Sequence, residues 1–296
     1  MIKLRNIITT LAVSILPFSV GAQTTVQVVT KKIEKTFPYR TGYDVNVEGE
    51  KAEMRVETWD RNEVHVVLEL VAKHPDRAVA ERDLEFMQYL ADRVQRRIYL
   101  RNYVRSPEDQ PKSESVFEAR YHIRVPEDCP VYLKDYFGNI DVRQLTNRLK
   151  IRSEFSTVGL SDLRGDIDVN TRFGDLHGQR IEGSMIIASQ RSNITLREVS
   201  GSYDIEAQYG VVEIFANELT SLNIRADKSN VFLHNVHPEQ YSYNLTAQNG
   251  SITTPSTLAF EQTRNLPNLQ KMVFKPTREL YPAITVSVSF GDIVVD

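Results

Sequence analysis

The carboxylate pair Asp166 and Asp168 is the feature of this 296-residue chain that looks most able to do chemistry. Two acids separated by one residue on a strand point to the same face, where they could transfer protons or bind a metal ion. A structural role is also open to them, because Arg148 and Lys150 have the same spacing one period earlier in an internal repeat. If residues one period apart lie side by side, each acid faces a base. We expect this ion ladder, worth about 0.2–1 kcal/mol per pair, and not a catalytic site.

The other residues able to do chemistry lack partners in the sequence. His234 and His237 are three residues apart without a third ligand nearby, and Cys129, the only cysteine, has no evident histidine partner. The sequence contains no nucleophile elbow, phosphate-binding glycine loop, zinc spacing or calcium-binding nonapeptide. We therefore expect no catalytic residue, no bound metal and no cofactor.

Aromatic residues recur at one position, immediately before a Gly or Ser that is itself repeated. Such a row could form a stripe on which sugars stack. These residues are an even number of positions after residues expected to be buried, so strand alternation places them on the same, inward side. We therefore expect an aromatic stack inside the fold. The residues are Phe137, Phe155, Phe173, Tyr209 and Phe290.

All of these residues are positioned by the internal repeat. A Gly or Ser followed two residues later by an apolar residue recurs at nearly equal intervals of about 18 residues, and the last two intervals are longer. A period of this length indicates one supersecondary unit stacked on copies of itself. The repeated residues are Gly138, Ser156, Gly174, Ser192, Gly210, Ser229, Gly250 and Gly291.

Within each repeat, apolar and polar residues alternate in two short runs separated by turns. Alternation with period two predicts strands, and stacked copies predict a mainly β fold: a parallel β-solenoid, or β-helix, of about 18-residue coils over residues 136–296. Ile140, Val158, Leu176 and Ile194 should then form one buried column. Right-handed winding is favoured, because parallel crossovers are almost always right-handed.

Residues 23–135 do not follow the 18-residue register. Alternating runs predict a β-rich segment there, and one helix over residues 76–96 is predicted to cap the solenoid. Asp76 and Pro75 mark the start of this helix. Its apolar residues at helical spacing are Leu84, Met87, Leu90, Ala91 and Val94.

The step from Gly250 to Gly291 is more than twice as long as one repeat. The excess predicts an insertion over residues 255–283 in the last coil. Insertions in repeat proteins lie on one face and often bind ligands. We expect this one to close the final coil, with a ligand or partner contact as the alternative.

Residues 1–22 have the basic start, short apolar middle and small final residues of a cleaved signal peptide. Removing Lys3 and Arg5 leaves 36 − 2 = 34 basic against 39 acidic residues, a balance that does not favour nucleic-acid binding. No later run is long enough to span a membrane. We expect an exported protein, periplasmic or at the cell surface, without an integral membrane segment.

The repeated phrases resemble the bacterial secreted family of β-strand-repeat putative adhesins, a neighbour of the putative autotransporter-adhesin head domains. The resemblance covers about Gly138 to Asp296 and implies an exported β-helix without catalytic residues. The predicted helix and the insertion depart from the family pattern. The phrases are Tyr136-Phe137-Gly138-Asn139-Ile140-Asp141-Val142, Arg164-Gly165-Asp166-Ile167-Asp168-Val169 and Tyr209-Gly210-Val211-Val212-Glu213-Ile214.

Two functions are compatible with this sequence. The first is a non-enzymatic extracytoplasmic scaffold or adhesin-like binding module that contacts an envelope protein or a surface glycan, or forms homo-oligomers. Its predicted contact is the outward apolar stripe Val211, Phe215 and Phe232. The alternative is a β-helix lyase or hydrolase acting on polysaccharide, which needs carboxylates and a base converging in one groove.

Overall fold

The computed structural model describes residues 25–105, 112–235, 237–277 and 280–296. These residues form one mixed sheet of 21 strands, with one α-helix and one 3-10 turn. The predicted mainly β fold is confirmed. Neither helical element of the described residues is long and apolar enough to cross a membrane. The signal peptide predicted for residues 1–22 lies outside the described residues.

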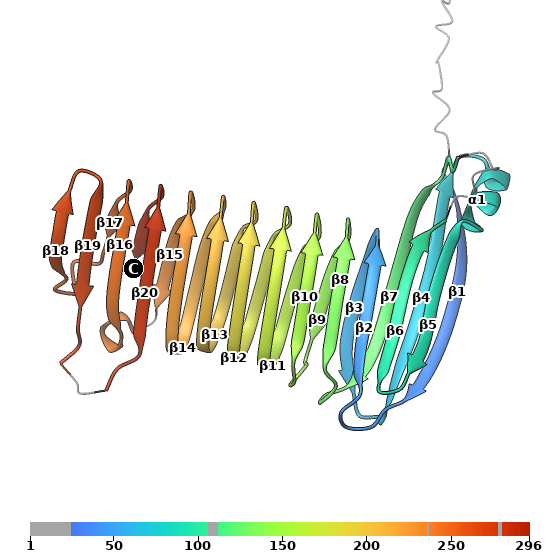
Figure 1. Cartoon of the computed structure of the whole chain (residues 1–296), viewed down its shortest axis with the longest axis horizontal. Helices are drawn as coiled ribbons and strands as arrows, with labels where there is room; N and C mark the ends of the chain where they lie inside the picture. The colour runs from blue at the N-terminus through green and yellow to red at the C-terminus, as the bar shows by residue number, and fades with distance from the viewer. Residues whose placement is uncertain (1–24, 106–111, 236, 278–279) are drawn as a thin grey trace, which may run out of the picture.

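Strands of consecutive repeats lie side by side along the long axis of the molecule (Figure 1). They are β8 (Val131–Tyr136), β9 (Asn139–Arg143), β10 (Leu149–Glu154), β11 (Thr157–Arg172), β12 (Leu176–Gln190), β13 (Ile194–Gln208), β14 (Val211–Asp227) and β15 (Asn230–Asn235). Their pairing is parallel, with Val158 opposite Leu176 and Leu176 opposite Ile194. The predicted 18-residue register is therefore confirmed from β8 to β13, and it lengthens to 19 residues between β14 and β15.

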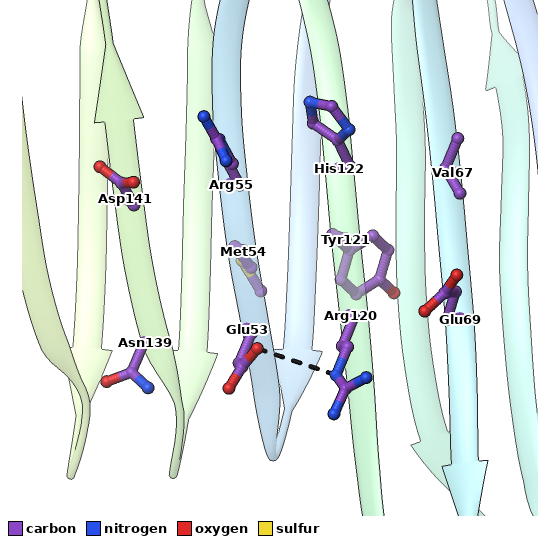
Figure 2. A pocket seen from close by; sticks show the side chains of 10 residues that line it. All are labelled: Glu53, Met54, Arg55, Val67, Glu69, Arg120, Tyr121, His122, Asn139 and Asp141. Carbon is purple, nitrogen blue, oxygen red and sulfur yellow. Dashed lines mark ion pairs between the residues drawn. The ribbon is translucent and has the colours of Figure 1, made fainter. Parts of the chain in front are cut away.

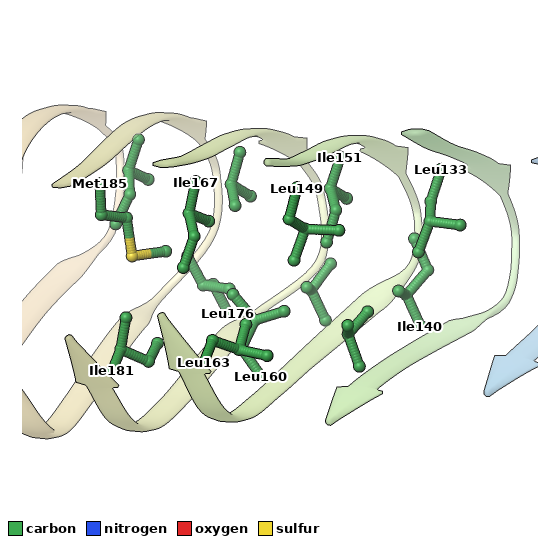
Figure 3. Packing of buried hydrophobic residues seen from close by; sticks show 14 of the residues in the cluster. Leu133, Ile140, Leu149, Ile151, Leu160, Leu163, Ile167, Leu176, Ile181 and Met185 are labelled. Carbon is green, nitrogen blue, oxygen red and sulfur yellow. The ribbon is translucent and has the colours of Figure 1, made fainter. Parts of the chain in front are cut away.

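Apolar columns fill the interior of the stacked repeats. Ile140 is 2% exposed, and Val158, Leu176 and Ile194 are fully buried, as predicted. Figure 3 shows the ribbon turning around Ile140, Leu176 and neighbouring apolar side chains. Because burial of one such side chain contributes about 1.5–3 kcal/mol, each added repeat strengthens the attachment of the next.

The N-terminal strands continue this stack. They are β1 (Gln27–Pro38), β2 (Asp44–Glu50), β3 (Ala52–Trp59), β4 (Glu63–His74), β5 (Met87–Val94), β6 (Arg97–Val104) and β7 (Val116–Pro126). β2 and β3 lie parallel to β8 and β9, with Val45 opposite Val131 and Met54 opposite Ile140. One apolar cluster runs through both parts, so the boundary placed between residues 135 and 136 does not separate two cores.

The first strands change the pairing from parallel to antiparallel. β4 pairs antiparallel with both β1 and β7, and β5 pairs antiparallel with β6. The outer strand β1 carries Lys31, Lys32 and Lys35. Charged side chains on an outer strand oppose pairing with another molecule, because they would be brought close to a second strand.

The helix predicted over residues 76–96 is wrong beyond Leu84. The helix α1 (Arg77–Leu84) is capped by the side chain of Asp76, which accepts a hydrogen bond from the Ala78 backbone nitrogen. It rests against β1 and β4 at one end of the molecule (Figure 1).

After α1 the chain forms the hairpin of β5 and β6. Met87 and Ala91 are buried, as strand alternation requires. Leu90 and Val94, which belong to the same helical pattern, are 48% and 57% exposed. Backbone pairing with β6 therefore overrides the helical spacing of the side chains.

The C-terminal strands do not follow one another in space. They are β16 (Ser242–Gln248), β17 (Ile252–Thr253), β18 (Glu261–Leu266), β19 (Leu269–Phe274), β20 (Ala283–Ser289) and β21 (Ile293–Val295). β20 lies between β14 and β16, and β21 lies between β15 and β17. The coil predicted to be the last is therefore not at the end of the stack, because its strands lie between those of two earlier repeats.

The predicted insertion 255–283 contains the hairpin of β18 and β19. β19 pairs antiparallel with β16. β18 pairs antiparallel with the other edge of β19 and is the outermost strand. Phe260 and Phe274 pack against Tyr243, with ring centroids 5.5 Å and 6.3 Å from its ring. The hairpin thus covers the apolar end of the stack at β16, whereas the last coil, which it was predicted to close, lies between β14 and β16.

Candidate functional site

The structure forms one rung of the predicted ion ladder. Lys150 Nζ lies 2.5 Å from Asp168 Oδ2 across β10 and β11. Arg148 and Asp166 line a surface hollow of about 540 Å³, and within the described ranges no ion pair joins them. Asp168 is therefore neutralised by the preceding repeat, while Asp166 faces solvent.

The three predicted contact residues do not form a continuous apolar patch. Val211, Phe215 and Phe232 are each half-buried. The Arg197 guanidinium lies 3.9 Å from the centre of the Phe215 ring, and the His234 ring lies 4.3 Å from it. The residues opposite Val211, Phe232 and Phe215 on the neighbouring strand are Asn230, Glu213 and His234.

The recurring aromatic residues lie outside the fold, so the predicted internal stack is wrong. Phe137, Phe155, Phe173, Tyr209 and Phe290 are between 41% and 58% exposed. Each has a positive φ, between +55° and +61°. They follow one edge of the stacked repeats, where the chain turns from one strand run to the next.

Other side chains complete this row. Each member except the last donates its backbone N–H to the carbonyl of the residue that precedes the next member, and this sets their order in space. We call the nine positive-φ residues in this order the aromatic ladder. They are Lys51, Phe137, Phe155, Phe173, Arg191, Tyr209, Lys228, Phe290 and Asn249.

The backbone conformation turns these side chains outward. Strand alternation alone would send Phe173 inward, because Thr171 two residues earlier is fully buried. Phe173 has φ +55°, so the chain bends there and the ring leaves the core. A bulky residue in the left-handed region costs about 1–2 kcal/mol. All nine ladder residues have positive φ, so a backbone cost arises at each of these positions.

Stacking offsets part of that cost. The ring centroids of Phe137 and Phe155 are 4.8 Å apart with an interplanar angle of 2°, and those of Phe155 and Phe173 are 4.8 Å apart at 7°. The guanidinium carbon of Arg191 lies 5.6 Å from the Phe173 ring and 5.4 Å from the Tyr209 ring. Such contacts add about 0.5–1.5 kcal/mol each, so the ladder is an ordered surface array.

The Phe155, Phe173 and Tyr209 rings present their edges to solvent, because neighbours cover both of their faces. Phe137 and Phe173 cover the two faces of Phe155. The edge is the positive side of an aromatic quadrupole. Three rungs, Lys51, Arg191 and Lys228, are basic, and none of the nine is acidic. The ladder is therefore an apolar line with positive electrostatic character.

A basic hollow lies beside the phenylalanine rungs. Its volume is about 410 Å³, and three basic residues, Lys134, Arg152 and Arg172, line it together with the acids Asp135 and Glu154. Lys134 pairs with Glu48 at 2.9 Å. Arg152 and Arg172 are exposed and form no ion pair within the part of the chain that the structure describes. This hollow widens the positive surface around the ladder.

A buried acid, Asp135, is hydrogen-bonded to the turns that carry the first phenylalanines of the ladder. Asp135 is fully buried, and its Oδ2 accepts a hydrogen bond from Ser156 Oγ at 2.8 Å. The same hydroxyl oxygen accepts a hydrogen bond from the Gly138 backbone nitrogen at 3.1 Å. Burial raises the pKa of Asp135 to about 7, because the carboxylate form loses solvation.

A further hollow lies where the repeats meet the N-terminal strands (Figure 2). Its volume is about 460 Å³. Arg120 Nε lies 3.8 Å from Glu53, and His122 Nε2 lies 2.6 Å from Glu57. Acids and bases gathered in one concavity could transfer protons, although these pairs also act as ion pairs between strands. The charged lining residues are Glu53, Arg55, Glu69, Arg120, His122 and Asp141.

The remaining predicted candidates lie apart from one another. His234 Nδ1 is 2.6 Å from Asp296, and His237 Nδ1 is 3.5 Å from Glu239. Cys129 is buried, and burial raises the pKa of its thiol, which disfavours the reactive thiolate. Among the described residues no three His, Cys, Asp or Glu side chains are grouped to hold a metal ion.

Comparison with known proteins gives structural similarities only. No family model and no curated protein matches the chain. It is similar to the structure of a putative cell adhesion protein from Clostridium sporogenes, with 10% identity, a TM-score of 0.23 and coverage of 90% of this chain and 99% of that one. A putative adhesin from Bacteroides fragilis has 13% identity and a TM-score of 0.40, covering 90% and 97%. A putative lipid binding protein from Parabacteroides distasonis has 14% identity and a TM-score of 0.31, covering 90% and 96%.

Proposed function

We propose that this chain is a non-enzymatic, adhesin-like binding module: an exported, right-handed parallel β-solenoid that contacts its partner through the aromatic ladder. The basic and apolar N-terminal residues support export. The parallel 18-residue register and the buried apolar columns support the solenoid. Right-handed winding follows the general preference of parallel crossovers.

The observation that carries the binding role is the exposure of ordered aromatic rings at a strained turn. A turn in the left-handed region is served best by Gly or Asn, and Asn249 occupies one rung of the ladder. Phe137, Phe155 and Phe173 occupy the same turn with rings about half exposed. Large exposed apolar surfaces on soluble proteins are typical of contact sites. A role in stability alone does not require rings that point into solvent.

Replacement of the rings by asparagine tests this function. Phe155→Asn and Phe173→Asn together remove two stacked rings while keeping residues that tolerate positive φ. Retention of the mature protein on immobilised envelope polysaccharide and envelope protein fractions should fall at least tenfold in this double variant, a loss of about 1.4 kcal/mol.

Ile186→Asn is the matched control, because Ile186 is an exposed apolar residue, 57% exposed, outside the ladder. It should bind like the unmodified protein. Equal retention of the double variant and this control would contradict a binding role for the ladder.

A second candidate function is cleavage of polysaccharide in the hollow of Figure 2. The observation that favours it is the presence of three acids, two arginines and one histidine in one concavity. Release of reducing ends or unsaturated products from a polysaccharide panel, abolished by His122→Ala and Glu53→Gln, would support this function over the binding module.

A further inference from the structure

We propose that the aromatic ladder binds a linear acidic polysaccharide that lies along the stacking direction of the repeats, with its carboxylates against Lys51, Arg191 and Lys228. This inference rests on the proposed binding function of the ladder and names its ligand class. It is carried by three features of the ladder: covered ring faces, unpaired basic rungs and the spacing between those rungs.

Covered ring faces argue against a neutral glycan. Sugars recognised by aromatic residues usually lie flat on a ring face, and the neighbouring rings occupy both faces of Phe155. The exposed edges carry the positive side of the ring quadrupole and attract negative groups. The same covering argues against single-stranded nucleic acid, whose bases need open aromatic faces for stacking.

The basic rungs are free to meet an anion. Arg191 is placed between two rings, and Lys228 Nζ donates a hydrogen bond to the Tyr209 hydroxyl at 3.0 Å. Within the described residues, no carboxylate lies within ion-pair distance of Lys51, Arg191 or Lys228. Other basic residues of the stacked repeats are already paired, as Arg180 is with Asp162 at 2.6 Å and Arg164 is with Glu182 at 3.1 Å.

The spacing of the basic rungs fits an acidic sugar chain. Arg191 is four rungs from Lys51, and Lys228 is two rungs from Arg191. Both intervals are therefore multiples of two rungs. Stacked rings are 4.8 Å apart, and twice this separation is close to the length of a disaccharide. Residues on one face of an extended peptide repeat at about 6.4–6.8 Å, which does not match this spacing.

The basic hollow adds positive charge where the ladder itself is aromatic. Arg152 and Arg172 line it beside the phenylalanine rungs between Lys51 and Arg191. The protein as a whole has a formal charge of −3, so a polyanion gains no general attraction from the rest of the surface. Binding should depend on several weak contacts acting together along one line, and should weaken as salt increases.

Binding of hyaluronate, which carries one carboxylate per disaccharide, tests the proposal against its methyl ester, in which the carboxylates are neutral. The mature protein should bind hyaluronate in low salt and bind the ester at least tenfold more weakly. Arg191→Gln with Lys228→Gln should weaken hyaluronate binding about tenfold. Arg40→Gln with Lys275→Gln removes the same charge from exposed positions outside the ladder and should leave binding unchanged.

The outcomes separate the ligand class from the binding function. Equal binding of hyaluronate and its ester, equal effects of the two glutamine pairs, or tighter binding of polyglutamate or oligothymidylate would overturn the acidic polysaccharide. If the Phe155→Asn, Phe173→Asn variant still loses retention on envelope fractions, the binding function stands with another ligand. If that variant retains all binding, both proposals are wrong.

Discussion

At the scale of single residues, one backbone angle decides whether a side chain belongs to the core or to the surface. Phe173 has the sequence parity of a buried residue, but its φ of +55° places the ring outside. The same conformation recurs at Arg191 and Lys228, which share no chemistry with phenylalanine but share its place in the repeat. Position in the turn, and not side-chain polarity, therefore sets exposure along the ladder.

The first prediction concerns the stability of the ladder. Phe155→Asn loses ring stacking but relieves backbone strain, and these effects oppose each other. We expect the free energy of unfolding to change by less than about 1.5 kcal/mol. Leu160→Ala in the same repeat empties a buried site and should cost about 2–5 kcal/mol. Urea unfolding compares the two, and equal losses would mean that Phe155 acts as a core residue.

The second prediction concerns pH. The pKa of Asp135 in the folded chain is about 7, above the ordinary value near 3.9. Between these values the folded chain keeps a proton that the unfolded chain releases, so the free energy of unfolding should fall as pH rises from about 4 to about 7. The decrease due to this group is up to about 4 kcal/mol, and it should level off above pH 7.

Asp135→Asn isolates this contribution, because it removes the titration and keeps the shape of the side chain. The variant should have a flatter stability profile between about pH 4 and 7, and should gain stability relative to the unmodified chain at pH 8. Histidine contributions are common to both proteins and cancel in the difference. Parallel profiles from urea unfolding at several pH values would show that Asp135 does not titrate in this range.

At the scale of elements, adjacent repeats approach one another closely at a column of glycines. The glycine column at the middle of β11, β12 and β13 has positive φ, and Gly183 has φ +130°. A Cβ at Gly183 would lie 2.4 Å from the backbone oxygen of Gly165. Neither strand can move away without breaking the parallel pairing on both sides.

We predict that Gly183→Ala destabilises the protein by more than about 2 kcal/mol, from strain and steric overlap together. Gly159→Ala is the matched control. A Cβ there would meet its nearest atom at 3.8 Å, and its backbone has no positive φ. The control should change the free energy of unfolding by at most about 1 kcal/mol. Thermal unfolding of both variants checks the prediction, which a tolerated Gly183→Ala would contradict.

At the scale of the whole molecule, the final repeat lies within the stack and not at its end. The final repeat is a parallel insertion, with β20 between β14 and β16 and β21 between β15 and β17. Ile284, Val286 and Val288 of β20 are buried between the apolar residues of its neighbours. The strands on either side are therefore held together by residues 283–295.

We predict that a chain ending at residue 282 loses much of its stability, because β14 and β16 are left without their shared partner. Its urea midpoint should fall, and it should bind a dye specific for exposed apolar surface. A synthetic peptide of residues 283–296 should restore the midpoint when added in trans.

The matched control is the same peptide with Val286→Lys and Val288→Lys, which places charges at two buried positions. It should not restore stability. An unchanged midpoint in the truncated chain would show that the final repeat is dispensable for the stack.

Much of the repeat and little of the aromatic ladder could be predicted from sequence. The column of Ile140 and Val158 was predictable, because repeats with the same apolar pattern bury their side chains together when they stack in register. The turn direction at Phe155 was not, because alternation rules apply only while the backbone stays extended. Arg191 and Lys228 could have been found by reading the same repeat position without regard to residue type.

The sequence by itself determined the repeat, its 18-residue register and the alternation that divides inward from outward residues, since these depend on local pattern and burial. Only the tertiary structure decided three other features: the strand after Leu84, the outward ladder and the inserted final repeat. Each depends on which backbone groups meet across the sheet. Pairing between distant strands contributes free energy that no local spacing of side chains records, and it can outweigh local preference.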